Sequence, residues 1–189
     1  TDGENHQGVA AFAAAHKYAD VGDILAAARA KNEPPFIIIA DGLNDPHNLG
    51  SIIRSANAAG AHGVIIPKNR SVSLNSVVAK VSTGAVEYTP VARVTNIAQT
   101  IEKLKKEGLW ICGTALEASE DYFDADLTGA LAIVIGSEGE GISRIVRESC
   151  DFLVKIPMIG QTESLNASVA AGILLYESLR QRNAANKKG

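Results

Sequence analysis

The hydrophobic residues of this chain fall into short apolar segments that alternate with segments of helical spacing. Segments with the length and pattern of strands cover residues 36–40, 63–66, 87–94, 109–112, 131–135 and 152–156. Apolar residues recur at helical spacing over 49–59, 74–81, 96–107, 142–148 and 167–182, and a short first helix follows Asp20. This alternation predicts an α/β fold, in which helices cover both faces of a mostly parallel sheet.

Length and composition fit one globular domain. The chain has 189 residues, of which 46% are hydrophobic and 21% are charged. A chain of this length buries roughly 70% of its unfolded surface, so it needs no disulfide or metal to fold. We expect residues 17–189 to form the domain and residues 1–16 to be a linker or an N-terminal arm. Cys112 and Cys150 lack CxxC spacing and lie in apolar surroundings, so we expect reduced core thiols.

Charge and hydropathy limit the possible partners. The apolar runs are too short to cross a membrane and no signal peptide is present, so we expect a cytoplasmic protein without a membrane partner. The net charge of −3 provides no general basic field, so nucleic acid would need a local patch or another domain. Basic residues that follow successive predicted strands form either such a patch or separate solvated charges: Arg54, Lys68, Arg70 and Lys80.

Two unusual loops lead from predicted strands into helices, at the edge of a parallel sheet where ligands bind. In the loop and helix start at 44–56, Asn48 is a candidate helix cap. Arg54 follows among small and apolar residues, and it is either functional or a helix arginine that reaches solvent. In the loop at 156–168, either Ser164 or Asn166 can cap the last helix.

A third loop, Gly-Ser-Glu-Gly-Glu-Gly at 136–141, directly follows the apolar segment 131–135. Glycines at a strand end allow a ligand to approach the backbone, although a plain tight turn would also need them. The spacing is not that of a dinucleotide-binding or P-loop motif. Because Glu138 and Glu140 would repel phosphates, the loop suits ribose hydroxyls, amines or a cation.

Three segments together resemble a known family: DPHNLGSIIRSA, IVIGSEGEGIS and IPMIGQTESLNASVAAGILLYE. In order, spacing and strand context they are similar to the three signature motifs of the TrmH family of SPOUT-class RNA 2′-O-ribose methyltransferases. The resemblance covers about residues 36–182. The segment HQGVAAF also resembles the linker before the catalytic domain in the bacterial 23S rRNA guanosine 2′-O-methyltransferase (RlmB-like) branch.

The resemblance implies a C-terminal deep trefoil knot, S-adenosylmethionine as cofactor, and a homodimer built partly on the last helix. The implied reaction is methyl transfer to a ribose 2′-hydroxyl of RNA, with a guanosine in 23S rRNA as the favoured target. A tRNA ribose is the alternative target, and a non-catalytic module that binds RNA or the cofactor is the alternative of another class.

Family roles carried over to matching positions give a candidate site. Arg54 resembles the catalytic arginine, and the positions that complete the catalytic site are Asn48, Glu138, Ser164 and Asn166. Positions expected to hold the cofactor are Gly113, Thr114, Gly136, Ile156, Met158 and Leu165. The scattered histidines lack metal-ligand spacing, so no metal is expected. Arginine is a poor proton acceptor, which leaves open whether Arg54 is a base or stabilises the developing alkoxide.

Overall fold

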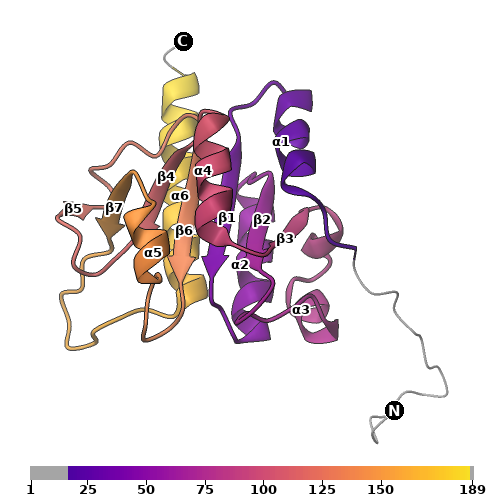
Figure 1. Cartoon of the computed structure of the whole chain (residues 1–189). Helices are drawn as coiled ribbons and strands as arrows, with labels where there is room; N and C mark the ends of the chain where they lie inside the picture. Colours follow the sequence, from indigo (N-terminus) through magenta and orange to yellow (C-terminus); the bar gives the residue numbers. More distant parts are fainter. Residues whose placement is uncertain (1–16, 188–189) are drawn as a thin grey trace, which may run out of the picture.

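Parallel strands form one sheet in the computed structural model, which describes residues 17–187 (Figure 1). The strands are β1 (Phe36–Asp41), β2 (Gly63–Pro67), β3 (Val91–Val94), β4 (Trp110–Thr114), β5 (Glu120–Asp121), β6 (Leu131–Gly136) and β7 (Phe152–Lys155). The order across the sheet is β3-β2-β1-β6-β4-β7-β5, and every neighbouring pair is parallel. The prediction of a mostly parallel sheet is confirmed.

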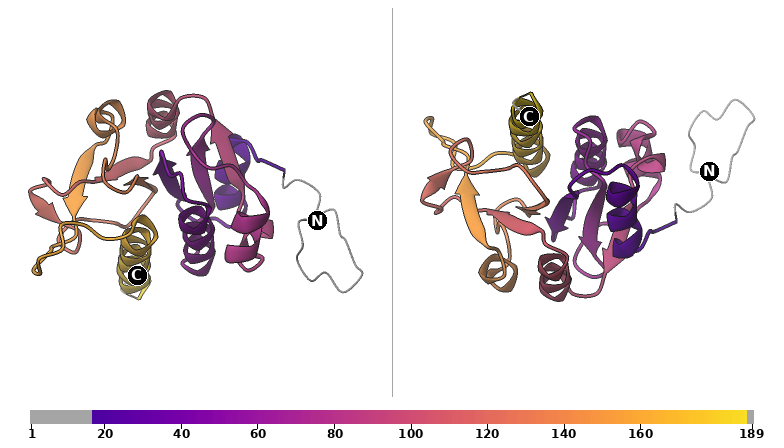
Figure 2. Two further views of the ribbon diagram at one scale, coloured as in Figure 1. Left: turned by 90° about the horizontal axis from the view of Figure 1, so that it is seen from below. Right: turned by 90° about the horizontal axis from the view of Figure 1, so that it is seen from above.

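Helices cover both faces of this sheet (Figure 2). They are α1 (Val21–Ala30), α2 (Pro46–Ala58), α3 (Ser76–Val81), the 3₁₀ turn η1 (Ala85–Glu87), α4 (Ile97–Lys106), α5 (Arg144–Glu148) and α6 (Ala167–Asn186). One apolar core joins Ile38 and Ile133 of the sheet to α2 and α6. A second core joins Ile37 and Ile39 to α1, α4 and α5. Alternate residues of β1 therefore enter opposite cores, which explains why that strand is apolar throughout.

Some predicted boundaries are wrong. The strand expected at 87–94 is confined to Val91–Val94, because η1 occupies Ala85–Glu87 before it. Tyr88 lies in the connection between η1 and β3, where its ring is 80% exposed rather than packed in the core. The helix expected at 142–148 begins at Arg144, and the last helix continues beyond 182 to Asn186. The two-residue strand β5 was not predicted, since Glu120 and Asp121 carry no apolar pattern.

The start of α2 also differs from the prediction. Asp45 is the N-cap, and its side chain accepts a hydrogen bond from the His47 amide at 2.8 Å. Pro46 fills the first helical position, where a missing N–H group is tolerated. Asn48 therefore lies inside the helix rather than capping it, and its buried side chain is left for another role.

Cys112 and Cys150 are both free, as predicted. Burial raises the pKa of both thiols, that of Cys150 to about 12, so neither is activated as a nucleophile. Within residues 17–187 no helix combines the length and hydrophobicity that crossing a membrane requires. The expected arm at 1–16 lies outside the described residues.

Candidate active site

The three loops singled out in the sequence meet at the carboxyl edge of the sheet. Asp41 at the end of β1 is paired in register with Gly136 at the end of β6, so the loops that follow begin side by side. β4 and β7 end at the same edge because all four strands are parallel. The loop from β7 to α6 returns to this edge through a hydrogen bond between Asn166 and Glu138.

The loop after β6 is a tight hairpin. The Ser137 and Gly141 amides each donate to the carbonyl oxygen of the other residue, at 3.0 and 2.9 Å. Gly139 and Gly141 adopt left-handed backbone angles (φ 87° and 67°), which a side chain would disfavour. A Cβ atom on Gly136 would lie 2.0 Å from the Gly141 carbonyl carbon. The hairpin's own backbone thus requires a glycine at 136, and the turn projects Glu138 at its exposed tip.

One carboxylate oxygen of Glu138 joins this hairpin to the other two loops. Glu138 Oε1 accepts hydrogen bonds from Asn48 Nδ2 at 3.1 Å and from Asn166 Nδ2 at 2.5 Å. It also accepts from the Ala167 amide at 3.4 Å. Asn166 Nδ2 donates a second bond to Asn48 Oδ1 at 2.9 Å. We call Asn48, Glu138 and Asn166 the amide–carboxylate network.

Asn166 has two tasks that only an amide can combine. Its Oδ1 accepts from the Ser168 and Val169 amides at 2.9 and 3.3 Å, which caps α6. Its Nδ2 group meanwhile supplies both protons that reach Glu138 and Asn48. Of the two predicted cap candidates, Asn166 is therefore the one that caps the helix.

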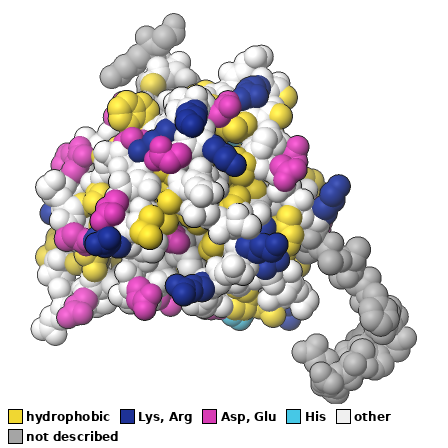
Figure 3. All heavy atoms as spheres, in the orientation of Figure 1, with side chains coloured by type: hydrophobic (Ala, Val, Ile, Leu, Met, Phe, Trp, Pro, Cys, Tyr) yellow, Lys and Arg dark blue, Asp and Glu magenta, His cyan; other side chains and the backbone are white. Residues whose placement is uncertain are grey.

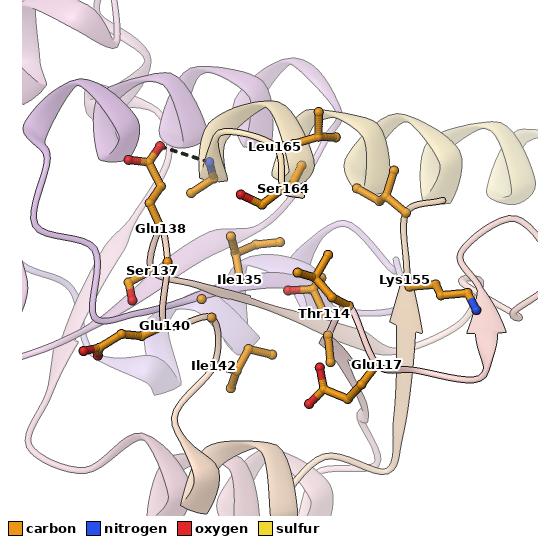
Figure 4. Close-up of a pocket in the computed structure, with 18 of the residues that line it drawn as sticks. Thr114, Glu117, Ile135, Ser137, Glu138, Glu140, Ile142, Lys155, Ser164 and Leu165 are labelled. Carbon is orange, nitrogen blue, oxygen red and sulfur yellow. Dashed lines mark hydrogen bonds between the residues drawn. The ribbon is translucent and has the colours of Figure 1, made fainter. Parts of the chain in front are cut away.

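A pocket of about 380 Å³ opens beside the network, between the ends of β4, β6 and β7 (Figure 4). Its apolar wall includes Ile135, Ile142, Ile156 and Leu165, and carboxylates stand around it at Glu117, Glu138, Glu140 and Glu163. In Figure 4, Glu138 lies next to the start of α6 while Glu117 lies at the far end with Thr114. The Thr114 hydroxyl donates to the Val134 carbonyl at 3.0 Å, which ties β4 to β6 at the pocket floor.

Five of the six positions expected to hold the cofactor line this pocket: Thr114, Gly136, Ile156, Met158 and Leu165. Gly113 is not a lining residue. A Cβ atom there would come within 2.6 Å of Leu153 and 2.8 Å of Cys150 Sγ, so packing beneath the pocket requires the glycine. Glu117 and Glu163 line the pocket but were missed, although Glu117 follows a predicted strand end and could have been found by that rule.

The pocket fits S-adenosylmethionine. Its volume lies in the range of small-molecule sites, and its apolar wall suits a flat adenine ring. The carboxylates suit the donors and the positive charge of the cofactor, namely ribose hydroxyls, an amino group and a sulfonium. Lys155 borders the same space, and its ammonium nitrogen lies 3.8 Å from Asp121 Oδ1.

A second hollow of about 350 Å³ adjoins the first, and it is lined by Leu43, Asn44, Asp45, Asn48, Ser137, Glu138 and Glu140. Ser137, Glu138 and Glu140 line both spaces. The network residues Asn48 and Glu138 therefore stand where a group bound in one space would meet a group bound in the other.

The expected catalytic residues are brought together in part. Asn48, Glu138 and Asn166 are in direct contact, and Ser164 lines the first pocket. Arg54 is exposed on α2 and lines neither space. Its side chain forms no hydrogen bond or ion pair with any residue in the described part of the chain. Within residues 17–187, no group of three or more His, Cys, Asp or Glu side chains is arranged to hold a metal ion.

Comparisons with known proteins agree with this geometry. Residues 35–176 match the model of the SpoU rRNA Methylase family. YacO of Bacillus subtilis (strain 168), which carries the name of a TrmH family tRNA/rRNA methyltransferase, is 58% identical over 178 residues, or 94% of this chain and 72% of that protein. The SpoU methyltransferase AviRb from Streptomyces viridochromogenes, solved in complex with AdoMet, is 35% identical with a TM-score of 0.74 over 78% of this chain and 60% of that chain.

A solved RNA 2′-O ribose methyltransferase is 34% identical with a TM-score of 0.71, and the match covers 87% of this chain and 59% of that chain. This chain thus spans about three fifths of these two solved chains. The parallel α/β fold, the pocket and the matches define the class as S-adenosylmethionine-dependent RNA methyltransferases. Within that class, the chain belongs to the SpoU rRNA methylase family, which includes the TrmH proteins it resembles.

Proposed function

We propose that this chain transfers a methyl group from S-adenosylmethionine to the ribose 2′-hydroxyl of a guanosine in 23S rRNA. The observation that carries the proposal is the position of the amide–carboxylate network, on the border between a cofactor-sized pocket and a second polar hollow. The family match and the likeness to an RNA 2′-O ribose methyltransferase support the same reaction. An RNA target of this kind would also place the enzyme in the cytoplasm.

The two spaces divide the reaction between them. When bound in the first pocket, S-adenosylmethionine supplies a methyl group on a positively charged sulfur. The target ribose occupies the second hollow, where Asn48 and Glu138 face it. Glu138 Oε1 is held by three donors, while Oε2 has no hydrogen-bond partner in the described chain. Oε2 can accept a hydrogen bond from the 2′-hydroxyl and take up its proton as the oxygen receives the methyl group. Fixing the hydroxyl in line with the methyl group provides much of the rate enhancement.

Arg54 has the role of stabilising negative charge on the attacking oxygen. Because it borders neither space within one chain, it needs the RNA or a second subunit to bring it into the reaction. Because Arg54 forms no ion pair within residues 17–187, no carboxylate of the described chain already occupies its guanidinium group. Stabilisation of the alkoxide agrees with arginine chemistry better than proton abstraction does.

A homodimer built partly on α6 is the second part of this proposal. Val169 and Tyr176 are 50% and 53% exposed, and their spacing of seven residues puts them on one stripe of the helix. Ile159, in the loop before α6, is 99% exposed. Exposed apolar side chains of this size are typical of surfaces that another protein covers.

We also propose that the loop between β7 and α6 passes through the chain as a deep trefoil knot. The return of this loop to Glu138, through Asn166, and the packing of α6 against α2 support this proposal.

A tRNA ribose remains the alternative target. The name of YacO, which covers both tRNA and rRNA, supports this alternative.

Methylation of purified 23S rRNA and of bulk tRNA with methyl-labelled S-adenosylmethionine separates these targets. We expect label in 23S rRNA, at a guanosine that digestion identifies as the 2′-O-methyl nucleoside. Label in tRNA alone would replace 23S rRNA as the target. Cofactor binding without label in either RNA would favour the non-catalytic module.

A further inference from the structure

The positive charges of this acidic chain are unevenly distributed. Residues 46–86 contain no Asp or Glu, and their cations are Arg54, Lys68, Arg70 and Lys80. All four side chains are exposed, and none forms an ion pair in the described part of the chain. Figure 3 shows the face that α4 and α5 cover, where Lys and Arg lie beside Asp and Glu, whereas α2, α3 and α6 cover the opposite face of the sheet (Figure 2).

The loop after β2 lies directly beside the second hollow. The Val72 amide donates to the Leu43 carbonyl at 2.8 Å, and Leu43 lines that hollow. A Cβ atom on Gly42 would touch the Arg70 carbonyl oxygen at 3.8 Å. Arg70 itself has a left-handed backbone (φ 55°), a conformation that residues with side chains seldom adopt. Lys68 and Arg70 are thus carried by a segment anchored to the rim of the hollow.

Close helix packing extends this basic region. A Cβ atom on Gly50 of α2 would lie 2.8 Å from the Val81 side chain of α3, so the two helices meet closely there. Lys80 directly precedes Val81, and Arg54 lies one helical turn beyond Gly50. The exposed cations of α2, α3 and the loop after β2 therefore belong to one continuous part of the molecule, next to the hollow.

The hollow itself repels a phosphodiester. Asp45, Glu138 and Glu140 line it, and their negative charges suit hydroxyls and amines but not phosphates. RNA whose target ribose enters the hollow must lead its backbone away from these carboxylates. The neighbouring region of residues 46–86, which contains no Asp or Glu, is the side of the hollow that favours the RNA backbone.

We propose that Lys68, Arg70 and Lys80 form a phosphate-binding surface, which holds the RNA backbone next to the target nucleotide. The proposal rests on the proposed function for the identity of the ligand. This basic surface positions RNA without reading sequence, because phosphate contacts carry no base information. It also explains how a chain with net charge −3 holds RNA through a local patch.

Charge-neutral variants test the surface. The variant K68Q/R70Q/K80Q is compared with the control K31Q/K103Q/K106Q. The control also removes three exposed cations that form no ion pair within residues 17–187, and these lie at the C-terminal ends of α1 and α4, near the amino ends of the strands. A fluorescently tagged fragment of 23S rRNA is the probe, and fluorescence anisotropy gives its dissociation constant at several salt concentrations. Because Arg70 has an unusual backbone, K68Q/K80Q is measured as well, and thermal melting checks that each variant folds.

For K68Q/R70Q/K80Q we expect RNA binding to weaken at least about tenfold and the slope of log affinity against log salt to flatten by about 2. K68Q/K80Q should show about two thirds of that slope change. The control variant should keep the wild-type slope, and all variants should keep their affinity for S-adenosylmethionine by calorimetry.

Equal losses in both triple variants, or an unchanged slope in K68Q/R70Q/K80Q, would overturn the proposal. So would a change in oligomeric state that accounts for the loss. The wild type could also bind RNA and transfer no methyl group. If K68Q/R70Q/K80Q then flattens the slope of log affinity against log salt and the control variant does not, the proposed phosphate-binding surface is supported and the proposed function fails.

Discussion

Asn166 Nδ2 lies 2.5 Å from Glu138 Oε1, so the residue that caps the last helix also holds the tip of the hairpin after β6. This contact connects segments that are far apart in the chain. It makes the geometry of the proposed reaction centre depend on the position of α6.

Replacing Asn166 by Asp tests this dependence. The variant keeps an oxygen that can cap α6, but it places a second carboxylate against Glu138 where the native amide donates. We expect methyl transfer to fall at least about 100-fold and the free energy of unfolding to fall by about 1–3 kcal/mol. Steady-state kinetics and thermal melting measure the two effects. Asn166→Ser, which keeps a cap without the repulsion, should be more stable than Asn166→Asp but equally inactive; near-normal turnover in either variant would contradict the role of the network.

Arg54→Ala separates catalysis from folding. The side chain is exposed and makes no hydrogen bond or ion pair with the described chain, so its loss should leave the melting temperature unchanged. We expect methylation to be abolished while calorimetry finds nearly wild-type affinity for S-adenosylmethionine. Lost cofactor binding would show that Arg54 supports the cofactor pocket instead, and normal turnover would remove it from the reaction.

Gly136→Ala should destabilise the protein. The added methyl group would collide with the backbone at Gly141, 2.0 Å away, and neither segment can move without opening the hairpin. We expect a loss of about 1–3 kcal/mol in chemical denaturation and weaker cofactor binding. Gly160→Ala is the matched control, since nothing lies within 4 Å of its Cβ position. Equal stability of the two variants would contradict this account of the hairpin.

His62 should make stability fall in mild acid. Its ring is buried; Nδ1 accepts from the Phe36 amide at 3.0 Å, and Nε2 contacts Glu33 at 3.1 Å. Burial lowers the His62 pKa from its ordinary value of 6.5, and the charges of Lys31 and Arg182 act in the same direction, whereas Glu33 opposes them.

The unfolded chain therefore binds the proton first. The contribution of His62 to stability is fully present above about pH 6.5 and decreases as the pH falls through the lowered pKa. Melting temperatures near neutral pH and near about pH 5.5 should differ more for the wild type than for His62→Gln. The same difference in both proteins would mean that His62 does not titrate on unfolding.

The sequence predicted the central architecture well because β1 and β6 are apolar at every position that enters a core. Elements defined by tertiary contacts were harder to find. Glu120 and Asp121 form β5 only because they pair with Val154 and Lys155 of β7. Tyr88 lies outside β3 because the chain forms the turn η1 directly before it. A pattern of β-branched and aromatic residues does not reveal such a turn.

The candidate site shows the same division. Motif resemblance identified Asn48, Glu138 and Asn166, but not that one carboxylate oxygen joins them. Asn48 was a plausible cap by residue type, yet Asp45 and Pro46 begin the helix earlier and leave Asn48 buried. Gly113 was expected at the cofactor because it ends a predicted strand, whereas its packing against Leu153 and Cys150 depends on side chains that meet only in the folded chain.

The most direct test of the proposed reaction is the chemical identity of the methylated nucleoside. 23S rRNA incubated with the enzyme and methyl-labelled S-adenosylmethionine is digested to nucleosides and analysed by mass spectrometry. The account predicts a single labelled product, 2′-O-methylguanosine, which is absent when Arg54→Ala replaces the wild type. A methyl group on a base, or no labelled nucleoside from any ribosomal or transfer RNA, would contradict it.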